Sequence, residues 1–300
     1  RSFFLPVLIL IILKIIFLIP VFDSLEYKAQ DSLFHMRGPR QISEDIVIIA
    51  IDDESFSALN TTWPFPRDYH AKLIENLSEA GAKLIIFDIE FTENSRYPES
   101  DMLLANAAAA SNNVVFAGKV LHGKTHDDPD QLLTPIGDIV ANGSPWGIVN
   151  MNSDSDNAIR KYSLFEEMDN HKYYSIGVAG LANSRLYQSD WADHLHSEDA
   201  HLTVANHKIP IYKHNKAIIN YYGPASSFPH ISYASVIDDS TMAMPGYQGI
   251  EFDEFYSIRD SGILQDKIVL IGATIDELHD KFPTPFGGEW TPGVEIHANF

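Results

Sequence analysis

Short apolar runs without strict polar alternation recur along the chain and predict buried β-strands. The clearest are Ile46–Ile51 (IVIIAI) and residues 83–91 (KLIIFDIEF). Strands of this kind are covered on both faces, as in a parallel sheet with helices on either side. Between them, residues 68–80 carry apolar side chains at helical spacing, after Pro66 and before Gly81. Pro and Gly at these positions are typical of helix ends. Strand, helix and strand in this order predict a βαβ unit with a right-handed crossover.

Similar patterns in the rest of the chain extend this unit to a larger domain. Residues 147–152 and 158–165 predict a β-hairpin around Asp154 and Asp156. The predicted fold class is α/β, with a mostly parallel sheet sandwiched by helices and an additional β-hairpin region. Further strands are expected at residues 113–120, 216–222 and 266–273, and further helices at residues 100–111, 173–186, 232–237 and 291–299.

The longest apolar stretch, residues 2–22, predicts one N-terminal transmembrane helix. Its 21 residues are interrupted by one charge, Lys14, and at 1.5 Å per residue they just span a hydrocarbon core of about 30 Å. A cleaved signal peptide is the alternative, but no small-residue cleavage site follows the stretch. Arg1 precedes the stretch and Asp23 and Glu26 follow it. The positive-inside rule therefore places residues after 22 on the extracytoplasmic, periplasmic side of the inner or cell membrane.

Residues 23–36 predict a juxtamembrane helix that ends at Gly38-Pro39. Its apolar stripe, which includes Leu25 and Leu33, suits either a second subunit, giving a homodimer, or the chain's own domain. Because the chain starts with Arg rather than Met, it is expected to be a piece of a longer protein. Its expected parts are residues 1–22, the transmembrane helix; residues 23–40, the juxtamembrane helix and linker; and residues 41–300, the extracytoplasmic domain.

Composition narrows the range of partners. The chain has 41 acidic and 21 basic residues, a formal net charge of −20, and no cysteine. Such a surface repels nucleic acid and anionic lipid headgroups and attracts cations, so no nucleic-acid partner is expected. The lack of cysteine excludes disulfides, thiolate metal sites and a cysteine nucleophile.

Acidic residues are expected to meet where the strands of the βαβ unit end. Asp52 and Asp53 follow the first strand, and Asp88 and Glu90 lie near the end of the second. Open α/β sheets bind ligands at this edge. Arg67, near the start of the helix, is expected to hold an anion or one of these carboxylates. The alternative is that the acids cap helices or face solvent. The candidate ligand-binding residues are Asp52, Asp53, Arg67, Asp88, Glu90 and Asp280, and the metal candidates among them are Asp52, Asp88 and Glu90.

No catalytic residue is predicted. The chain has no phosphate-binding loop, dinucleotide-binding fingerprint, zinc-protease motif or nucleophile elbow. Residues 122–130 and 193–201 contain His, Asp and Glu, but both are expected to be solvated surface loops. The turn at Asp154 lacks the Gly and the distal Glu of a calcium loop. No cofactor is identified, and a divalent cation at the strand-end acids is the candidate ion.

The order and spacing of short motifs over nearly the whole chain resemble the second type of CHASE domain. One departure is Asn157, where that family usually has Gly, and Asn tolerates the same left-handed turn. The matching stretches are the membrane helix and residues 31–37, 48–53, 63–67 (WPFPR), 81–88, 154–160, 218–221, 267–273, 284–286 and 292–299.

The resemblance implies an extracytoplasmic sensory domain that follows one membrane helix. Further membrane helices and a cytoplasmic output domain would lie beyond Phe300; an adenylate or guanylate cyclase is the commonest output, and histidine or Ser/Thr kinases are the alternatives. The resemblance does not identify the ligand, which is expected to be a small molecule or a protein. It also supplies no catalytic residues. Two further hypotheses stay open: a structural dimerisation module without a ligand, and a metal-dependent hydrolase built on the strand-end carboxylates.

Overall fold

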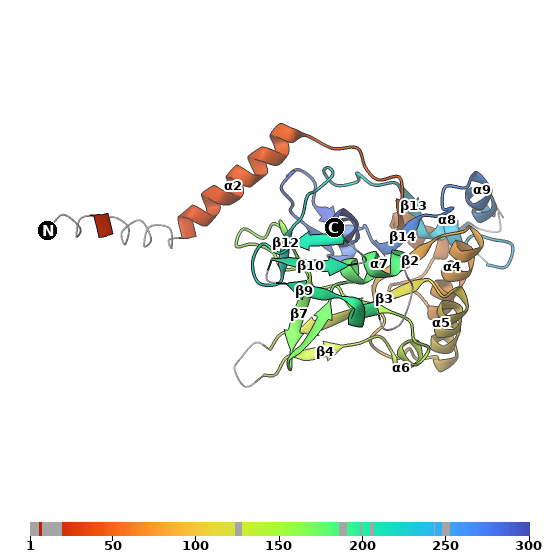
Figure 1. Cartoon of the computed structure of the whole chain (residues 1–300). Helices are drawn as coiled ribbons and strands as arrows, with labels where there is room; N and C mark the ends of the chain where they lie inside the picture. Colours follow the sequence, from red (N-terminus) through yellow and green to blue (C-terminus); the bar gives the residue numbers. More distant parts are fainter. Residues whose placement is uncertain are drawn as a thin grey trace.

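A computed structural model describes residues 6–7, 20–123, 128–185, 191–198, 200–204, 207–242, 244–247 and 253–300. In this part of the chain, a central sheet has the strand order β13-β1-β14-β2-β3-β4, and β5 also pairs with β3 (Figure 1). All these pairings are parallel except β3 with β4. The strands are β1 (Ile46–Ile51), β2 (Leu84–Glu90), β3 (Val114–Leu121), β4 (Gln131–Leu133), β5 (Trp146–Ile148), β13 (His230–Ser232) and β14 (Ile268–Ala273).

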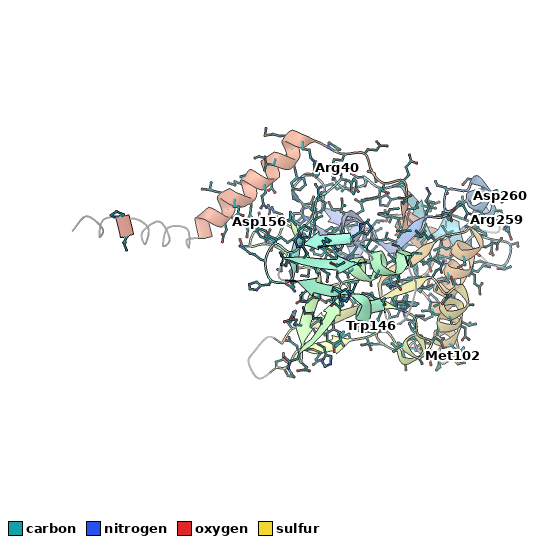
Figure 2. The ribbon with its side chains drawn as sticks, in the orientation of Figure 1. Arg40, Met102, Trp146, Asp156, Arg259 and Asp260 are labelled. Carbon is teal, nitrogen blue, oxygen red and sulfur yellow. The ribbon has the colours of Figure 1, made fainter. Side chains whose placement is uncertain are left out.

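Helices cover both faces of this sheet, which confirms the predicted α/β class. Alternate residues of one strand enter different cores: Val47 and Ile49 belong to one cluster, and Ile48 belongs to the other. Side chains fill both layers, while Met102 lies on the outer surface (Figure 2). The first layer contains α3 (Asp53–Leu59), α4 (Arg67–Glu79), α5 (Pro98–Ser111), α6 (Gly137–Ala141), α8 (Tyr233–Ile237) and α9 (Glu254–Ser261), and the second contains α7 (Ile176–Arg185) and α10 (Gly293–Asn299).

The predicted βαβ unit forms, but its two strands are not neighbours. The strand β14 lies between β1 and β2, so that Val269 is paired with Val47 on one side and with Ile85 on the other. A buried apolar strand can pair along either of its two edges. The local sequence pattern does not determine which distant strand will lie beside it. A second difference is α3, a short helix that was not predicted and that begins directly after Asp52.

The predicted β-hairpin of residues 147–152 and 158–165 is wrong. The strand β5 joins the central sheet through β3, whereas β6 (Lys161–Ser163) pairs with β12 (Lys216–Ile218). The turn between them does form, since the Asn157 N–H donates to the Asp154 carbonyl at 2.9 Å and the Asp154 N–H donates to the Ala158 carbonyl at 2.9 Å. Asn157 takes the left-handed conformation there, with a φ of 66°, but the strands on either side of the turn pair elsewhere. The other small strands are β7 (Phe165–Met168), β8 (His171–Tyr174), β9 (His196–Glu198), β10 (His201–Val204), β11 (His207–Pro210), β15 (Lys281–Phe282) and β16 (Thr291–Pro292).

Other predicted boundaries shift where antiparallel strands form. The helix expected at residues 173–186 begins only at Ile176, since Tyr173 and Tyr174 belong to β8. The expected loop at residues 193–201 contains β9, which pairs with β10. His126 and Asp127 of the expected loop at residues 122–130 lie outside the described residues. Short 3₁₀ helices complete the described elements: η1 (Trp191–His194), η2 (Pro245–Tyr247) and η3 (Asp276–Leu278).

The predicted juxtamembrane helix is observed as α2 (Pro20–Arg37). It lies on the side of the domain opposite to α4 and α5 (Figure 1). The predicted transmembrane stretch, residues 2–22, falls mostly outside the described residues. Within the part of the chain that is described, no helix combines the length and the apolar character needed to cross a bilayer.

Candidate functional site

A cavity of about 660 Å³ lies at the carboxyl ends of β2, β3 and β14. This is the edge at which α/β sheets bind ligands, because the chain leaves the parallel strands there in loops. The residues that matter for its chemistry are Asp88 and Glu90 of β2, Lys119 of β3, Asp280, Trp63, and His297 of α10.

Asp88 is the central acid of this cavity. Its side chain is 9% exposed, and its Oδ2 atom has no hydrogen-bond partner among the described residues. Burial raises the pKa of Asp88 well above its usual value, and the negative charges of Asp280 and Glu90 raise this pKa further, while Lys119 opposes them. Asp88 is therefore a buried carboxyl group with unused hydrogen-bonding capacity.

His297 faces Asp88 from α10 and is hydrogen-bonded through Nδ1 to the hydroxyl of Tyr162. The backbone N–H of Gly177 donates to the Tyr162 hydroxyl oxygen at 3.1 Å, and the hydroxyl is hydrogen-bonded to His297 Nδ1. The tautomer with the ring proton on Nε2 is the one in which the Tyr162 hydroxyl donates to Nδ1. Burial lowers the pKa of His297 to about 3, so the ring is neutral. Its Nε2 lies 3.6 Å from Asp88 Oδ1 and, in the described part of the chain, has no hydrogen-bond partner.

Asp280 enters the cavity from the loop between η3 and β15. A Cβ atom at Gly293 would overlap the Asp280 carboxylate, so the glycine leaves the space that this side chain occupies. The backbone N–H of Gly293 also donates to the carbonyl of Asp280 at 2.9 Å. Burial raises the pKa of Asp280 to about 6; Glu90 adds to this effect and Lys119 opposes it.

The two basic residues of the cavity already have partners. Lys119 Nζ lies 2.6 Å from Glu90 Oε1 at the more exposed rim. Arg67 was expected to hold an anion or a strand-end carboxylate, but it pairs instead with Asp101 of α5 at 3.4 Å. It also donates to the carbonyl of Glu93 at 3.0 Å. The acid of α5 is nearer because α4 and α5 pack side by side.

Of the six candidate ligand-binding residues, four line the cavity: Arg67, Asp88, Glu90 and Asp280. Asp52 and Asp53 do not, because β14 separates β1 from β2. Asp52 caps α3 by accepting a hydrogen bond from the Ser55 N–H at 2.9 Å, and it accepts another from the Ser232 hydroxyl at 2.8 Å. Asp53 is exposed in the first turn of α3. Helix capping, the alternative interpretation of these acids, is what the structure shows for Asp52.

The three metal candidates do not form one group. Among the described residues, no set of three or more His, Asp or Glu side chains has an arrangement that could hold a metal ion. Asp88 and Glu90 share the cavity, while Asp52 lies at the start of α3.

Lys119 and His297 are cavity residues that the sequence reasoning missed. Lys119 had one usable signal, since it is the single charge near the end of a predicted apolar strand. His297 had none, because only the packing of α10 against β14 brings it to Asp88.

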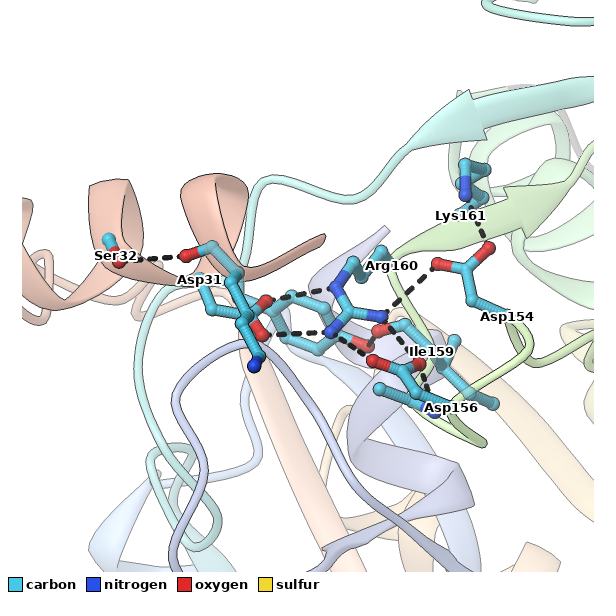
Figure 3. A network of polar contacts seen from close by, with 10 residues as sticks. Asp31, Ser32, Asp154, Asp156, Ile159, Arg160 and Lys161 are labelled. Atoms are coloured by element: carbon cyan, nitrogen blue, oxygen red, sulfur yellow. Dashed lines mark hydrogen bonds and ion pairs between the residues drawn. The ribbon is translucent and has the colours of Figure 1, made fainter. Parts of the chain in front are cut away.

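A second cluster of charges ties α2 to the domain, centred on Arg160, whose side chain is 3% exposed. The guanidinium binds Asp31 of α2 at 2.8 Å and Asp156 at 2.8 Å (Figure 3). It also pairs with Asp154 at 3.3 Å and lies 4.7 Å from the ring centre of Tyr27, which is on the same helix as Asp31. Planar guanidinium groups suit such multiple, bidentate pairing.

An apolar cluster continues this connection toward the cavity. Phe34 of α2 packs edge-on against Phe286, with ring centres 5.7 Å apart. Both rings belong to a cluster with Tyr162 and the cavity residue Phe282. Tyr162 is two residues after Arg160 and contacts His297, so the cavity wall and α2 share one packed unit.

The fold and cavity together define an α/β domain with a ligand-sized site at the carboxyl edge of its sheet and a helix docked on its side. A model of the CHASE2 domain family matches residues 7–300. The chain therefore belongs to the CHASE2 family, whose members are extracytoplasmic sensory domains of signalling receptors. This confirms the resemblance found in the sequence. No curated protein and no solved structure is significantly similar to the chain.

Proposed function

We propose that this chain is the signal-input part of a membrane-bound receptor. Residues 2–22 anchor it in the inner or cell membrane, and the domain after them lies outside and recognises a ligand in the carboxyl-edge cavity. The output domain is an adenylate or guanylate cyclase, with a histidine or Ser/Thr kinase as the alternative. The family membership and the cavity at the sheet edge support this proposal.

The observation that carries the proposal is the physical connection between the cavity and α2. On the cavity side, His297 is hydrogen-bonded to Tyr162 of β6. On the helix side, Arg160 pairs with Asp31 of α2. A ligand that contacts His297 or Phe282 would therefore act on the same strand and apolar cluster that hold α2.

Signalling through this connection requires two positions of α2 with different affinities for the ligand. A ligand that prefers one position shifts the population toward it, and the shift is limited by the difference in binding free energy. Small displacements of a docked helix are a common form of such switching. The Arg160 cluster and the apolar cluster around Phe34 are the contacts that would differ between the two positions.

The test uses the full-length receptor in membrane vesicles. Asp31→Asn removes one charge from the contact with α2, and Asp23→Asn removes the same charge from an exposed position of that helix. Basal output is measured as cyclic nucleotide formed from ATP or GTP, and as phosphate incorporated into protein. We expect Asp31→Asn to change basal output by about fivefold or more and Asp23→Asn to leave it unchanged. Equal output from both variants and the unaltered receptor would contradict the proposal, and the product formed decides between cyclase and kinase.

A second function, dimerisation through α2, is favoured by the exposed apolar residues of that helix. Tyr27, Asp31 and Phe34 face the domain. Leu33 and Met36 are 65% and 83% exposed, and at 100° per residue they lie on the other side of the helix. We propose that this face, together with Leu25, pairs with the same helix of a second subunit.

The absence of cysteine makes this second function easy to test. Leu33→Cys in the 300-residue chain introduces one thiol on the apolar face, and Lys28→Cys introduces one at an exposed position outside it. Under mild oxidation we expect a disulfide-linked dimer from Leu33→Cys and much less from Lys28→Cys. Equal cross-linking of the two variants, or none, would contradict pairing through this face.

A further inference from the structure

We propose that the carboxyl-edge cavity binds a small molecule that carries a primary ammonium group next to an oxygen acceptor. The ammonium would lie against Asp88 and Asp280, and the oxygen would accept a hydrogen bond from His297 Nε2. This inference rests on the proposed function, in which the cavity is the site that the signal molecule occupies.

The first support is a pair of buried polar atoms that lack partners among the described residues. In the described part of the chain, Asp88 Oδ2 has no donor, and His297 Nε2, which carries the ring proton when the Tyr162 hydroxyl donates to Nδ1, has no acceptor. Both side chains are more than nine-tenths buried and both line the cavity. Buried polar groups are rarely left without hydrogen bonds. A ligand with an N–H donor and an adjacent oxygen acceptor would satisfy both atoms at once.

The second support is the charge of the cavity. Its basic groups are engaged: Lys119 pairs with Glu90, and Arg67 pairs with Asp101. In the part of the chain that is described, no Lys or Arg forms an ion pair with Asp88 or Asp280. Because Lys119 is paired with Glu90, the two carboxyl groups of Asp88 and Asp280 have no ion-pair cation of their own in the described part of the chain, which favours a cationic ligand over an anionic or neutral one.

The third support is size, which distinguishes an organic cation from a bare metal ion. About 660 Å³ is within the range of cavities that hold small organic molecules. The cavity walls include the aromatic side chains of Trp63 and Phe282, and aromatic rings attract ammonium groups. Within the described residues no metal-binding group of three side chains is present.

The ligand test is a thermal-shift screen of the purified 300-residue chain. The probes are ethanolamine and glucosamine, each of which has one primary amine beside an oxygen, and each is tested beside its N-acetylated counterpart, whose amide nitrogen carries no charge. We expect at least one amine to raise the melting temperature and its acetylated counterpart to have no effect. A ligand at a hundred times its Kd stabilises strongly enough to be seen in this way. If no amine raises the melting temperature, or if acetylated and free amines do so equally, the proposal is overturned.

The roles of Asp88 and Asp280 are tested by isothermal titration calorimetry with the amine that binds most tightly. We expect Asp280→Asn and Asp88→Asn each to weaken binding about thirtyfold or more, as when one partner of a buried charge pair is removed. Asp53→Asn, which removes a charge outside the cavity, should leave the affinity unchanged. Circular dichroism checks the fold of each variant, and Asp280→Asn serves if Asp88→Asn does not fold. Unchanged affinity in a folded Asp280→Asn would overturn the assignment.

Binding should also weaken as the pH falls. The groups that face Asp88 and Asp280 are Glu90 of β2, Lys119 of β3 and His297 of α10. Because the pKa of Asp280 is raised to about 6, this acid takes up a proton on acidification and loses the charge that attracts an ammonium. We expect the affinity to fall by about tenfold or more between pH 8 and pH 5, and a pH-independent affinity would contradict this site.

This inference and the proposed function fail separately. If no amine binds while Asp31→Asn still changes the receptor's output, the domain remains a signal-input domain and the ligand class is wrong. If an amine binds at Asp280 while Asp31→Asn leaves the output unchanged, the site stands and the route through α2 is wrong.

Discussion

The guanidinium of Arg160 and the carboxylate of Asp31 form two parallel hydrogen bonds between positions 129 residues apart. The Nε–Oδ1 distance is 2.9 Å and the Nη2–Oδ2 distance is 2.8 Å. Asp31 is the only one of the three acids around Arg160 that belongs to α2; Asp154 and Asp156 belong to the domain itself. One buried guanidinium thus joins the helix that would follow the membrane to the body of the sensory domain.

Arg160→Met should destabilise the domain by about 3 kcal/mol. The substitution leaves Asp31, Asp154 and Asp156 close together without their cation, and breaking a partly buried charge network in this way is costly. Urea unfolding of the purified chain measures the change. Arg259→Met is the matched control, because Arg259 also pairs with two acids but lies on the exposed face of α9, far from Asp156 (Figure 2). Equal losses in the two variants would contradict the special role of Arg160.

Gly293→Ala should displace Asp280 and destabilise the chain by about 1–3 kcal/mol. The added Cβ atom would overlap the Asp280 carboxylate, whereas the same substitution at Gly137 meets no atom within 4 Å. We expect Gly137→Ala to be neutral or slightly stabilising, since it reduces the entropy of the unfolded chain. Thermal unfolding of both variants provides the comparison, and equal melting temperatures for the two would contradict the close approach of Gly293 and Asp280.

Tyr162→Phe should destabilise the chain by about 1–3 kcal/mol, because it leaves Gly177 N–H and His297 Nδ1 buried without a partner. The substitution should also remove the hydrogen bond that favours one tautomer of His297. Long-range ¹H–¹⁵N NMR spectra of the unaltered chain should show His297 neutral at pH 6, with its proton on Nε2, and the variant should lose this preference. A proton on Nδ1 in the unaltered chain would contradict donation from the Tyr162 hydroxyl to His297.

Asp280→Asn should stabilise the chain at pH 8 by an amount on the order of 2 kcal/mol. The pKa of Asp280 is about 6 in the folded chain, against a usual value of 3.8. An acid whose pKa is raised on folding favours the folded state below its unfolded pKa, and this stability is lost as the pH rises through the folded pKa. The difference between Asp280→Asn and the unaltered chain should therefore be largest above pH 6 and vanish near pH 4.

The control for this pH dependence is Asp53→Asn, which removes an exposed carboxylate outside the cavity. His70 and His297, which are buried in the described part of the chain, also change stability with pH, because burial lowers both pKa values to about 3. They are the same in the unaltered and substituted chains, so their effect cancels in the difference. A constant difference from pH 4 to pH 8 would contradict the raised pKa of Asp280.

The individual elements could be predicted from local sequence where one physical signal dominated. The strand Ile46–Ile51 was predicted with its observed bounds, because six consecutive apolar residues suit burial on both faces. Helix α5 was predicted within two residues from its alanines. The short helices α3 and α9 were missed, since seven or eight residues give too few turns for a periodic pattern.

The part of the candidate site that was predicted correctly also depended on one local signal. Asp88 and Glu90 line the cavity because the position of an acid near the end of a parallel strand fixes the edge at which it lies. Asp52 lies at the equivalent end of β1 but outside the cavity, because the chain places β14 between the two strands. The turn at Asp154 forms as predicted, but the hairpin does not, because β5 pairs with β3 and β6 pairs with β12.

The sequence by itself determined which segments are buried strands, which edge of the sheet carries the acids, and which family the chain belongs to. The strands and the acids depend on residue type and local spacing, and the family depends on the order of short motifs along nearly the whole chain. Only the tertiary structure decided that β14 separates Asp52 from Asp88, that His297 faces Asp88, and that Arg160 holds Asp31. The physical reason is that apolar strands and charged side chains have many energetically similar partners, and the choice among them is made by the packing of the whole domain.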